Sequence, residues 1–191
     1  MQSYDKPSKI KFTFNKNKFV NNAFDLIKTI ILAMIMVSVI FTLFVREANV
    51  EGSSMQNTLQ TKDRVFLTNF LYQPKNGDIV VINAENLEEK RIIKRVIAIE
   101  NQTLRIDYDT GNVYVDEIKI DEPYISSETG KSSFPAEIPY TIPKGYIFVM
   151  GDNRAMSKDS RNETIGLVSV DDVIGKAQFV FYPFDRAGYL Y

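Results

Sequence analysis

Three short segments contain the side chains of this chain that could perform nucleophilic or acid–base chemistry. The stretch "NVEGSSMQNTL" places two hydroxyls, Ser53 and Ser54, directly after Gly52, a residue that permits a close approach of the backbone. A serine hydroxyl is a weak nucleophile until a neighbouring base takes its proton. The run "KRIIKRVIAIE" offers the amine of Lys94 as that base, and "GDNRAMSKDSR" offers polar groups that could orient it.

Two residue types that commonly serve such sites are absent from the chain. Its 191 residues include no histidine and no cysteine. A Ser-His-Asp triad, a cysteine nucleophile, a disulfide and a metal site with histidine or thiolate ligands are therefore excluded. The formal net charge of −1 argues against a general nucleic-acid-binding surface. We expect chemistry by hydroxyl, amine or carboxylate groups, with no metal and no other cofactor.

Lys94 lies in a run whose pattern is that of a strand. Because side chains alternate between the faces of a strand, Ile92, Lys94, Val96 and Ala98 share one face. Apolar neighbours desolvate a lysine, which lowers its pKa and makes its neutral amine a competent general base. The alternative is an edge lysine whose stem reaches solvent. Arg95 cannot be the base, because a guanidinium stays protonated.

The third segment follows the apolar run "YIFVM" and is rich in turn-forming residues. Ser157 supplies a further hydroxyl, and Asp159 with Arg161 could form an ion pair that orients a neighbouring base. The alternative is a solvated loop with surface ion pairs.

An apolar run, "LIKTIILAMIMVSVIFTLFV", precedes all three segments and carries Lys28 as its single charge. About 20 apolar residues span a bilayer. Lysines are frequent before the run, whereas acidic residues follow Arg46, so the positive-inside rule predicts a cytoplasmic N-terminus. We expect a cytoplasmic tail over residues 1–24, a single-pass anchor over 25–46 and an extracytoplasmic catalytic domain over 47–191. A cleaved signal peptide is the alternative, but "FVREANV" lacks a small-x-small cleavage pattern.

The sequence after the anchor predicts a mainly β domain. Short runs dense in Ile, Val, Phe and Tyr alternate with turn signals such as "PKNGD" and "DTGN". The runs are "DRVFLTNFLY", "GDIVVINA", "KRIIKRVIAIE", "QTLRIDYD", "NVYVDEIKI" and "GYIFVMGDN". Residues 121–145 are rich in Pro, Ser and Glu and predict an irregular insertion. The expected fold is one exported β-sheet domain preceded by one N-terminal transmembrane helix.

The order of these segments resembles the type I signal peptidases, in the single-anchor form typical of Gram-positive bacteria. The similarity covers nearly the whole chain from the membrane span onward. The segments that carry it are "GSSMQNTL", "DRV", "GDIVV", "KRVIAIE", "GNVYVDE", "EPY" and "GDNRAMSKDSR". The resemblance implies a membrane-bound serine endopeptidase that removes N-terminal signal peptides from exported precursors with a Ser-Lys dyad.

Matched by position, the resemblance implies that Ser54 is the nucleophile and Lys94 the general base. It implies that Ser157 hydrogen-bonds the lysine, and that Asp159 and Arg161 buttress the site. The backbone N–H of Ser54 is expected to contribute to the oxyanion hole.

Three positions depart from the family's pattern. Gly52 stands where some members have a serine that adds an oxyanion donor, so the second donor is unassigned. Asn57 replaces a usual proline, and "IAIENQ" replaces a usual "IGLPGD". Both changes are expected to alter loops around the dyad and, with them, the choice of substrate.

Partners follow from the same resemblance. Exported precursors, with pilins among them, are the expected substrates. The lipid bilayer is an expected contact of "DRVFLTNFLY", which offers Phe66, Leu67, Phe70, Leu71 and Tyr72. The alternative for this run is an ordinary strand with a buried face. The alternative function is a pilus assembly factor or chaperone that acts on pilin subunits, since some relatives encoded beside pilin genes have this role. A self-cleaving repressor with a Ser-Lys dyad fits poorly, because such proteins have no membrane span.

Overall fold

The computed structural model describes residues 16–84, 91–130 and 140–191. The chain divides into a unit over residues 1–43 and a compact unit over residues 44–191. Lys6, Lys9 and Lys11 of the predicted tail lie outside the described residues, as does the part of the predicted insertion over 131–139.

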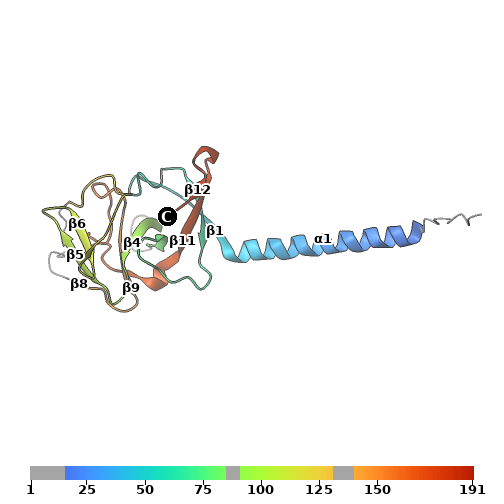
Figure 1. The fold of residues 1–191 in the computed structure, drawn as a ribbon, viewed down its shortest axis with the longest axis horizontal. Helices are drawn as coiled ribbons and strands as arrows, with labels where there is room; N and C mark the ends of the chain where they lie inside the picture. Colours follow the sequence, from blue (N-terminus) through green and yellow to red (C-terminus); the bar gives the residue numbers. More distant parts are fainter. Residues whose placement is uncertain (1–15, 85–90, 131–139) are drawn as a thin grey trace, which may run out of the picture. The chain divides into compact units, whose positions relative to one another are not determined.

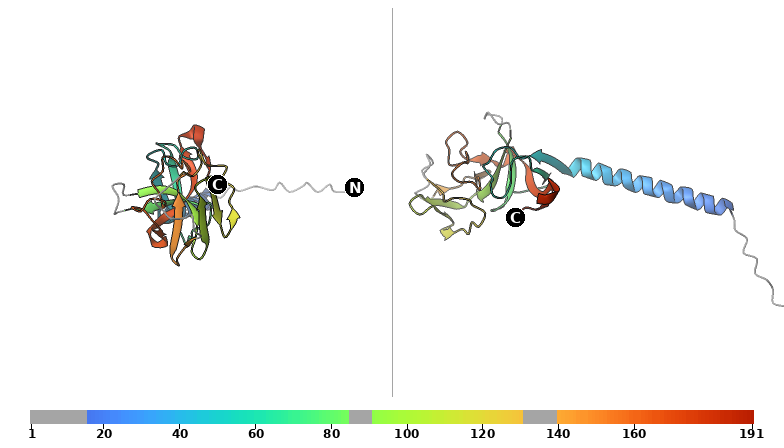
Figure 2. Two further views of the ribbon diagram at one scale, coloured as in Figure 1. Left: turned by 90° about the vertical axis from the view of Figure 1, so that its left-hand side faces the viewer. Right: turned by 90° about the horizontal axis from the view of Figure 1, so that it is seen from above.

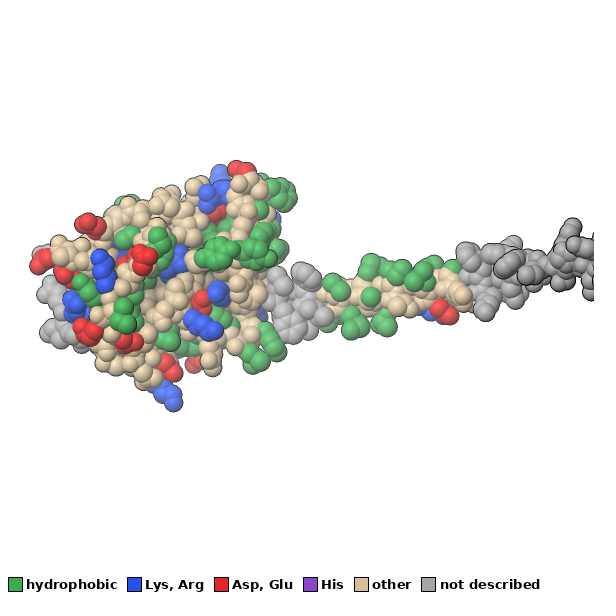
Figure 3. Space-filling view, in the orientation of Figure 1, with side chains coloured by type: hydrophobic (Ala, Val, Ile, Leu, Met, Phe, Trp, Pro, Cys, Tyr) green, Lys and Arg blue, Asp and Glu red, His purple; other side chains and the backbone are tan. Residues whose placement is uncertain are grey.

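The first unit contains helix α1, Lys16–Phe44 (Figure 1). Its apolar window Asn22–Val39 is long and apolar enough to cross a membrane, and its hydrophobic side chains are exposed (Figure 3). Lys28 lies one helical turn from Asp25, and the two side chains form an ion pair of 3.4 Å. The helix starts within the predicted tail, and the chain becomes strand β1 at Val45, because acidic and amide residues replace the apolar run there.

The second unit is built from antiparallel strands, which confirms the mainly β prediction (Figures 1 and 2). In the described residues, an eight-stranded sheet has the order β1-β2-β11-β3-β4-β9-β10, with β12 paired to β11. A four-stranded sheet has the order β7-β6-β5-β8. The strands of the large sheet are β1 (Val45–Asn49), β2 (Arg64–Thr68), β3 (Ile79–Asn83), β4 (Arg91–Ala98), β9 (Tyr146–Met150), β10 (Val168–Ser169), β11 (Val173–Tyr182) and β12 (Gly188–Tyr189). Those of the small sheet are β5 (Thr103–Asp107), β6 (Asn112–Val115), β7 (Ile118–Lys119) and β8 (Tyr140–Thr141), and the 3-10 helices are η1 (Val170–Asp172) and η2 (Phe184–Arg186).

All six predicted runs contain strands, but the longest strand, β11, was not predicted. It pairs with both β2 and β3 and so holds the middle of the large sheet. The predicted irregular insertion is also interrupted, since β8 lies within it and pairs with β5.

Strands β3 and β4 are buried on both faces, which explains their nearly continuous apolar sequences. Val81 packs in an apolar cluster with Val50, Met55 and Leu59, whereas Val80 packs in a second cluster on the opposite face. A further cluster joins the ends of β4 and β9 to the small sheet, which lies at one end of the unit (Figures 1 and 2). The central strands are therefore rigid supports for any side chain that they carry.

The run "DRVFLTNFLY" divides between the core and the surface. Leu67 is buried, and Tyr72 is half-buried with its hydroxyl donating to the Asp78 carboxylate at 2.7 Å. Phe70 and Leu71 are exposed at the turn after β2. Only part of the predicted lipid-contacting set is therefore available to solvent or lipid.

Candidate active site

Ser54 lies in the first turn of a loop that follows β1. Gly52 starts this turn with a φ of +81°, a left-handed conformation that glycine adopts without steric cost. The space beside Gly52 is open, so the expected reason for this glycine, a close approach, is wrong, and the backbone angle explains it. Met55 and Leu59 are buried in the core and are linked by a hydrogen bond from Leu59 N–H to Met55 C=O of 2.8 Å. The loop is thus anchored directly beyond Ser54.

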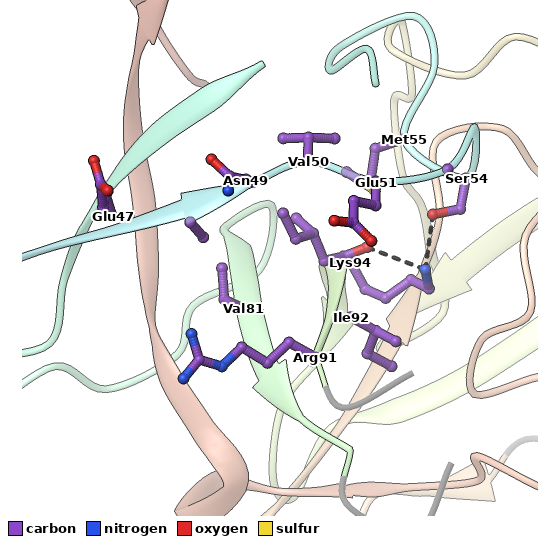
Figure 4. A pocket seen from close by; sticks show the side chains of 13 residues that line it. Glu47, Asn49, Val50, Glu51, Ser54, Met55, Val81, Arg91, Ile92 and Lys94 are labelled. Carbon is purple, nitrogen blue, oxygen red and sulfur yellow. Dashed lines mark hydrogen bonds between the residues drawn. The ribbon is translucent and has the colours of Figure 1, made fainter. Parts of the chain in front are cut away.

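Lys94 on β4 reaches Ser54 across 40 residues of sequence. Its Nζ donates to Ser54 Oγ at 2.8 Å and to the carbonyl oxygen of Ile93 at 3.1 Å (Figure 4). Its side chain is only 4% exposed, with Ile92 and Val96 of the same strand face in the core. The structure thus brings together the two residues that the sequence assigned as nucleophile and base, and it excludes the solvent-reaching alternative for the lysine.

Gly151, at the end of β9, brings the third predicted segment against the serine loop. Asn153 N–H donates to the carbonyl oxygen of Ser54 at 3.0 Å, and Asn153 Nδ2 donates to that of Ser53 at 3.2 Å. A Cβ at Gly151 would overlap the Ser54 carbonyl oxygen and the hydroxyl of Ser157. This close approach requires a glycine.

Asp159 and Arg161 form a buried ion pair directly beside this contact. Arg161 Nε and Nη2 donate to the two carboxylate oxygens of Asp159 at 2.8 and 2.9 Å, and Gly151 N–H donates to Asp159 Oδ2 at 3.0 Å. Burial raises the pKa of Asp159, but hydrogen bonds and charge from Arg161, with the Gly151 N–H, outweigh burial and hold that pKa below its usual range. The solvated-loop alternative for this segment is therefore excluded.

Ser157 does not make the hydrogen bond that the resemblance implies. Its Oγ is buried and has no hydrogen-bond partner among the described residues. The hydroxyl lies near enough to Asp159 to contribute to the lowered pKa of that carboxyl, although it is outside ordinary hydrogen-bonding geometry.

A second buried ion pair, which was not predicted from the sequence, includes Arg95, the residue directly after Lys94. Arg95 Nε and Nη2 donate to Asp152 at 2.9 and 2.7 Å, and Thr58 of the serine loop donates its hydroxyl to the same carboxylate. The guanidinium also stacks on the ring of Tyr124 at 3.9 Å. In the sequence, Arg95 directly follows Lys94 and Asp152 directly follows Gly151. This adjacency was the available indication that both residues lie near the site. This pair joins β4, the serine loop and the segment after β9.

A groove of about 460 Å³ opens beside the dyad (Figure 4). One wall is residues 47–52, and the opposite wall is residues 91–94 of β4, with Val81 below. β1 ends the large sheet, so one of its edges is unpaired within the described residues. β9 pairs only with residues 95–98 of β4, which leaves the edge of residues 91–94 without a partner among the described strands. Two free strand edges therefore flank the groove, an arrangement that can accept an extended peptide.

The described residues contain no group of three carboxylates that could hold a metal ion. A hydroxyl hydrogen-bonded to a buried amine, in a groove between free strand edges, is the arrangement that a serine peptidase of the Ser-Lys class requires.

Comparison with known proteins places the chain in one such family. Residues 23–182 match the family described as "Signal peptidase, peptidase S26". The chain is 36% identical over 168 residues to signal peptidase I T of Bacillus subtilis, covering 83% of this chain and 85% of that protein. It is 36% identical over 178 residues to a signal peptidase I of Bacillus licheniformis, covering 87% and 92%. A crystal structure of a signal peptidase I from Enterococcus faecalis aligns with a TM-score of 0.45 and 25% identity, over 55% of this chain and 97% of that one.

The chain belongs to the signal peptidase family, peptidase S26. It is a serine endopeptidase that removes signal peptides from exported proteins, and the Ser-Lys dyad is a feature of the family. The apolar helix α1 fits a membrane-anchored enzyme. These comparisons do not support the alternative role in pilus assembly.

Proposed function

We propose that Ser54 is the nucleophile and Lys94 the general base with which this signal peptidase cleaves exported precursors. The observation that carries the proposal is the 2.8 Å hydrogen bond between Lys94 Nζ and Ser54 Oγ beside the groove. Burial favours the neutral amine, whose lone pair can accept the hydroxyl proton across the same distance.

The reaction then proceeds through an acyl-enzyme. Lys94 takes the proton of Ser54 while Oγ attacks the carbonyl carbon of the scissile bond. The N–H of Ser54, which no described acceptor takes, faces the negative charge that develops on the carbonyl oxygen. The C–N bond breaks as the Lys94 ammonium returns its proton to the leaving amine. Water then hydrolyses the ester with Lys94 again as base.

The proposed substrate segment lies extended between the free edges of residues 49–52 and 91–94. Main-chain hydrogen bonds hold such a segment, and alternate side chains enter pockets. The apolar residues Val50, Val81 and Ile93 line the groove, so the pockets on this side suit small apolar side chains. We propose small residues one and three positions before the cut. Pilin precursors with signal peptides fall within the same substrate class.

The proposed topology places the N-terminus in the cytoplasm, one span in the cell membrane and residues 47–191 outside. The excess of lysine before α1 supports this orientation. The element boundaries support a domain that starts a few residues earlier, at β1.

We further propose that an aromatic surface of the second unit contacts lipid. Phe66 stacks on Phe181 with ring centroids 4.0 Å apart, and Phe179 packs edge-on against Tyr189 at 5.1 Å. Figure 3 shows hydrophobic side chains gathered over the surface that β11 and β12 form. Exposed apolar residues follow the strands that carry these rings, namely Phe70 and Leu71 after β2 and Phe184 after β11. Aromatic rings favour the interface between headgroups and water.

The dyad is tested with the full chain in detergent micelles and an exported precursor as substrate. Ser54→Ala and Lys94→Ala should each abolish cleavage, and the double variant should be no worse, because residues that act as one unit are not additive. Lys94→Arg should also be inactive, because a guanidinium stays protonated. With wild type, kcat/KM should rise with pH as the ammonium of Lys94 loses its proton.

Ser53→Ala is the matched control. It removes the neighbouring hydroxyl, whereas the hydrogen bond from Asn153 is made to the Ser53 carbonyl oxygen and is retained. An inactive Ser53→Ala beside an active Ser54→Ala would reverse the assignment of the nucleophile.

A further inference from the structure

Residues 47–52, which precede Ser54 in the chain, form one wall of the groove. Their backbone N–H and C=O groups alternate in direction along this wall. Val50 N–H donates to Asp63 C=O at 2.8 Å, and Val50 C=O accepts from Lys62 N–H at 2.9 Å. Both main-chain groups of Val50 thus point toward the chain before β2. Because these groups alternate in direction along an antiparallel strand, those of Asn49 and Glu51 point the other way, toward the groove. A bound peptide would therefore pair with Asn49 and Glu51.

The side chains of the same wall alternate between two faces. Ala48 and Val50 pack in the apolar cluster that also contacts Ile93 of the opposite wall. Glu47 and Glu51 are exposed on the other face. A peptide strand in the groove has the same alternation, so each of its side chains faces either the apolar cluster or the two glutamates.

The two glutamates differ in their partners. Glu47 forms an ion pair with Arg64, whose Nη2 donates to the Glu47 carboxylate at 2.6 Å and offsets its charge. Glu51 lines the groove together with Ser54 and Lys94 and has no ion pair or hydrogen bond with any described residue. Figure 4 shows its carboxylate above the side chain of Lys94. The negative charge nearest the reacting serine along this wall is therefore available to a substrate.

The positive groups of the groove do not cancel this charge in the reactive state. Lys94 must be neutral to accept the proton of Ser54, so it contributes no charge at that stage. Arg91 comes from the opposite wall and extends away from Ser54, toward the end of the groove that Glu47 occupies (Figure 4). The part of the groove beside Ser54 thus has a net negative wall when the enzyme is ready to react.

We propose that Glu51 recognises the charge of the substrate residue two positions before the cut and favours lysine or arginine there. This inference rests on the proposed function, in which small residues one and three positions before the cut face the apolar cluster. The intervening residue then faces the opposite side, where Glu51 lies. Signal peptides with a basic residue at this position are the preferred substrate class, and those with an acidic residue are disfavoured.

The test compares three peptides that differ only in the residue two positions before the cut, which is Lys, Gln or Glu. Full-length enzyme in detergent micelles is assayed for kcat/KM with each peptide. Because exposed charge pairs are weak, we expect the ratio for Lys over Glu to be about three- to tenfold in wild type at low salt. The ratio should shrink as ionic strength rises, since salt screens exposed charges. It should approach one in Glu51→Gln and invert in Glu51→Lys.

Glu163→Lys is the matched control, because Glu163 is an exposed acidic residue that does not line the groove. It should keep the wild-type ratio. The proposal is overturned if the wild-type ratio is one, or if Glu51→Gln, folded by its melting temperature, keeps the wild-type ratio. A folded wild-type enzyme that cleaves none of the peptides would instead overturn the proposed function and this inference with it.

Discussion

Gly151 is the residue on which the position of the nucleophile depends most directly. Its missing side chain leaves room for the Ser54 carbonyl oxygen and the Ser157 hydroxyl. A side-chain hydroxyl can rotate away from a new methyl group, whereas a backbone oxygen can move only with its peptide. Any larger residue at 151 must therefore displace the loop that carries Ser54.

We expect Gly151→Ala to reduce kcat by about a hundredfold, because a shift of about 1 Å in a reacting group is enough for such a loss. Cleavage of a precursor and the melting temperature measure activity and folding separately. Gly130→Ala is the control, since a Cβ there meets no neighbour among the described residues and the backbone angle is ordinary. A fully active Gly151→Ala would show that the serine loop adapts to the added carbon.

At the scale of elements, the loop after β9 is held by two buried carboxylate–guanidinium pairs. Asp159 pairs with Arg161 inside the loop, and Asp152 pairs with Arg95 on the strand that carries Lys94. A further buried pair, Arg154 with Glu122, ties the loop to the segment before β8. Removing one partner leaves the other charge buried and unpaired, which costs far more than the pair itself contributes. We interpret these pairs as devices that fix the position of the loop.

Arg161→Ala should lower the free energy of unfolding by about 3–5 kcal/mol and reduce cleavage, because it leaves Asp159 without its partner in the core. Thermal unfolding and precursor cleavage measure the two effects. Arg105→Ala is the control, because its contact with Glu117 is 4.0 Å long and the Glu117 side chain is 66% exposed, so the substitution leaves no buried charge unpaired. Equal melting temperatures for Arg161→Ala and wild type would contradict the role assigned to the pair.

The stability that the Asp159–Arg161 pair contributes depends on pH in a defined direction. Because the pKa of Asp159 in the folded protein lies below its usual value, the contribution of this carboxylate is complete above pH about 4. This contribution to stability is lost as the pH falls through the lowered pKa that Asp159 has in the folded protein. The stability difference between wild type and Asp159→Asn should therefore be constant near neutral pH and shrink on strong acidification.

At the scale of the whole molecule, the aromatic surface and the groove belong to one compact unit, residues 44–191. Leu71 is 86% exposed and Phe70 is 65% exposed at one turn of this unit. Exposed apolar side chains of this size are costly in water and are stabilised by burial in a lipid interface.

We expect residues 44–191 to bind lipid vesicles without the helix, and Leu71→Ser to weaken this binding by about tenfold, because burial of one leucine side chain contributes roughly 1.5–3 kcal/mol. Vesicle co-sedimentation measures the binding. Ile118→Ser is the control, since Ile118 is also exposed, at 70%, but belongs to the small sheet. Equal weakening by both variants would assign the binding to general hydrophobicity and not to the aromatic surface.

Local patterns in the sequence determined the features that depend only on residues close together in the chain, namely the helix, most strands and the faces of those strands. The long apolar run indicated helix α1, and dense β-branched runs indicated strands β2 to β6 and β9. Alternation along β4 also indicated that Lys94 shares a face with Ile92 and Val96, which the apolar cluster confirms. Strand β11 was missed because Gly175, Lys176 and Gln178 interrupt its apolar pattern. These residues are tolerated there because the strand is only partly buried.

The resemblance implied that Ser54 and Lys94 act together, but only the tertiary structure decided how these segments meet. Spacing along a strand determines the face of a side chain but not its partner, and the partner of Lys94 lies 40 residues away across the sheet order. The same holds for Asp152, whose adjacency to Gly151 placed it near the site but did not indicate Arg95 as its partner, and for Gly151, whose close neighbours come from a distant loop. The groove exists because β9 pairs with only half of β4 and β1 ends the sheet. Such free edges follow from the order in which strands pair, which long-range packing sets and no local pattern encodes.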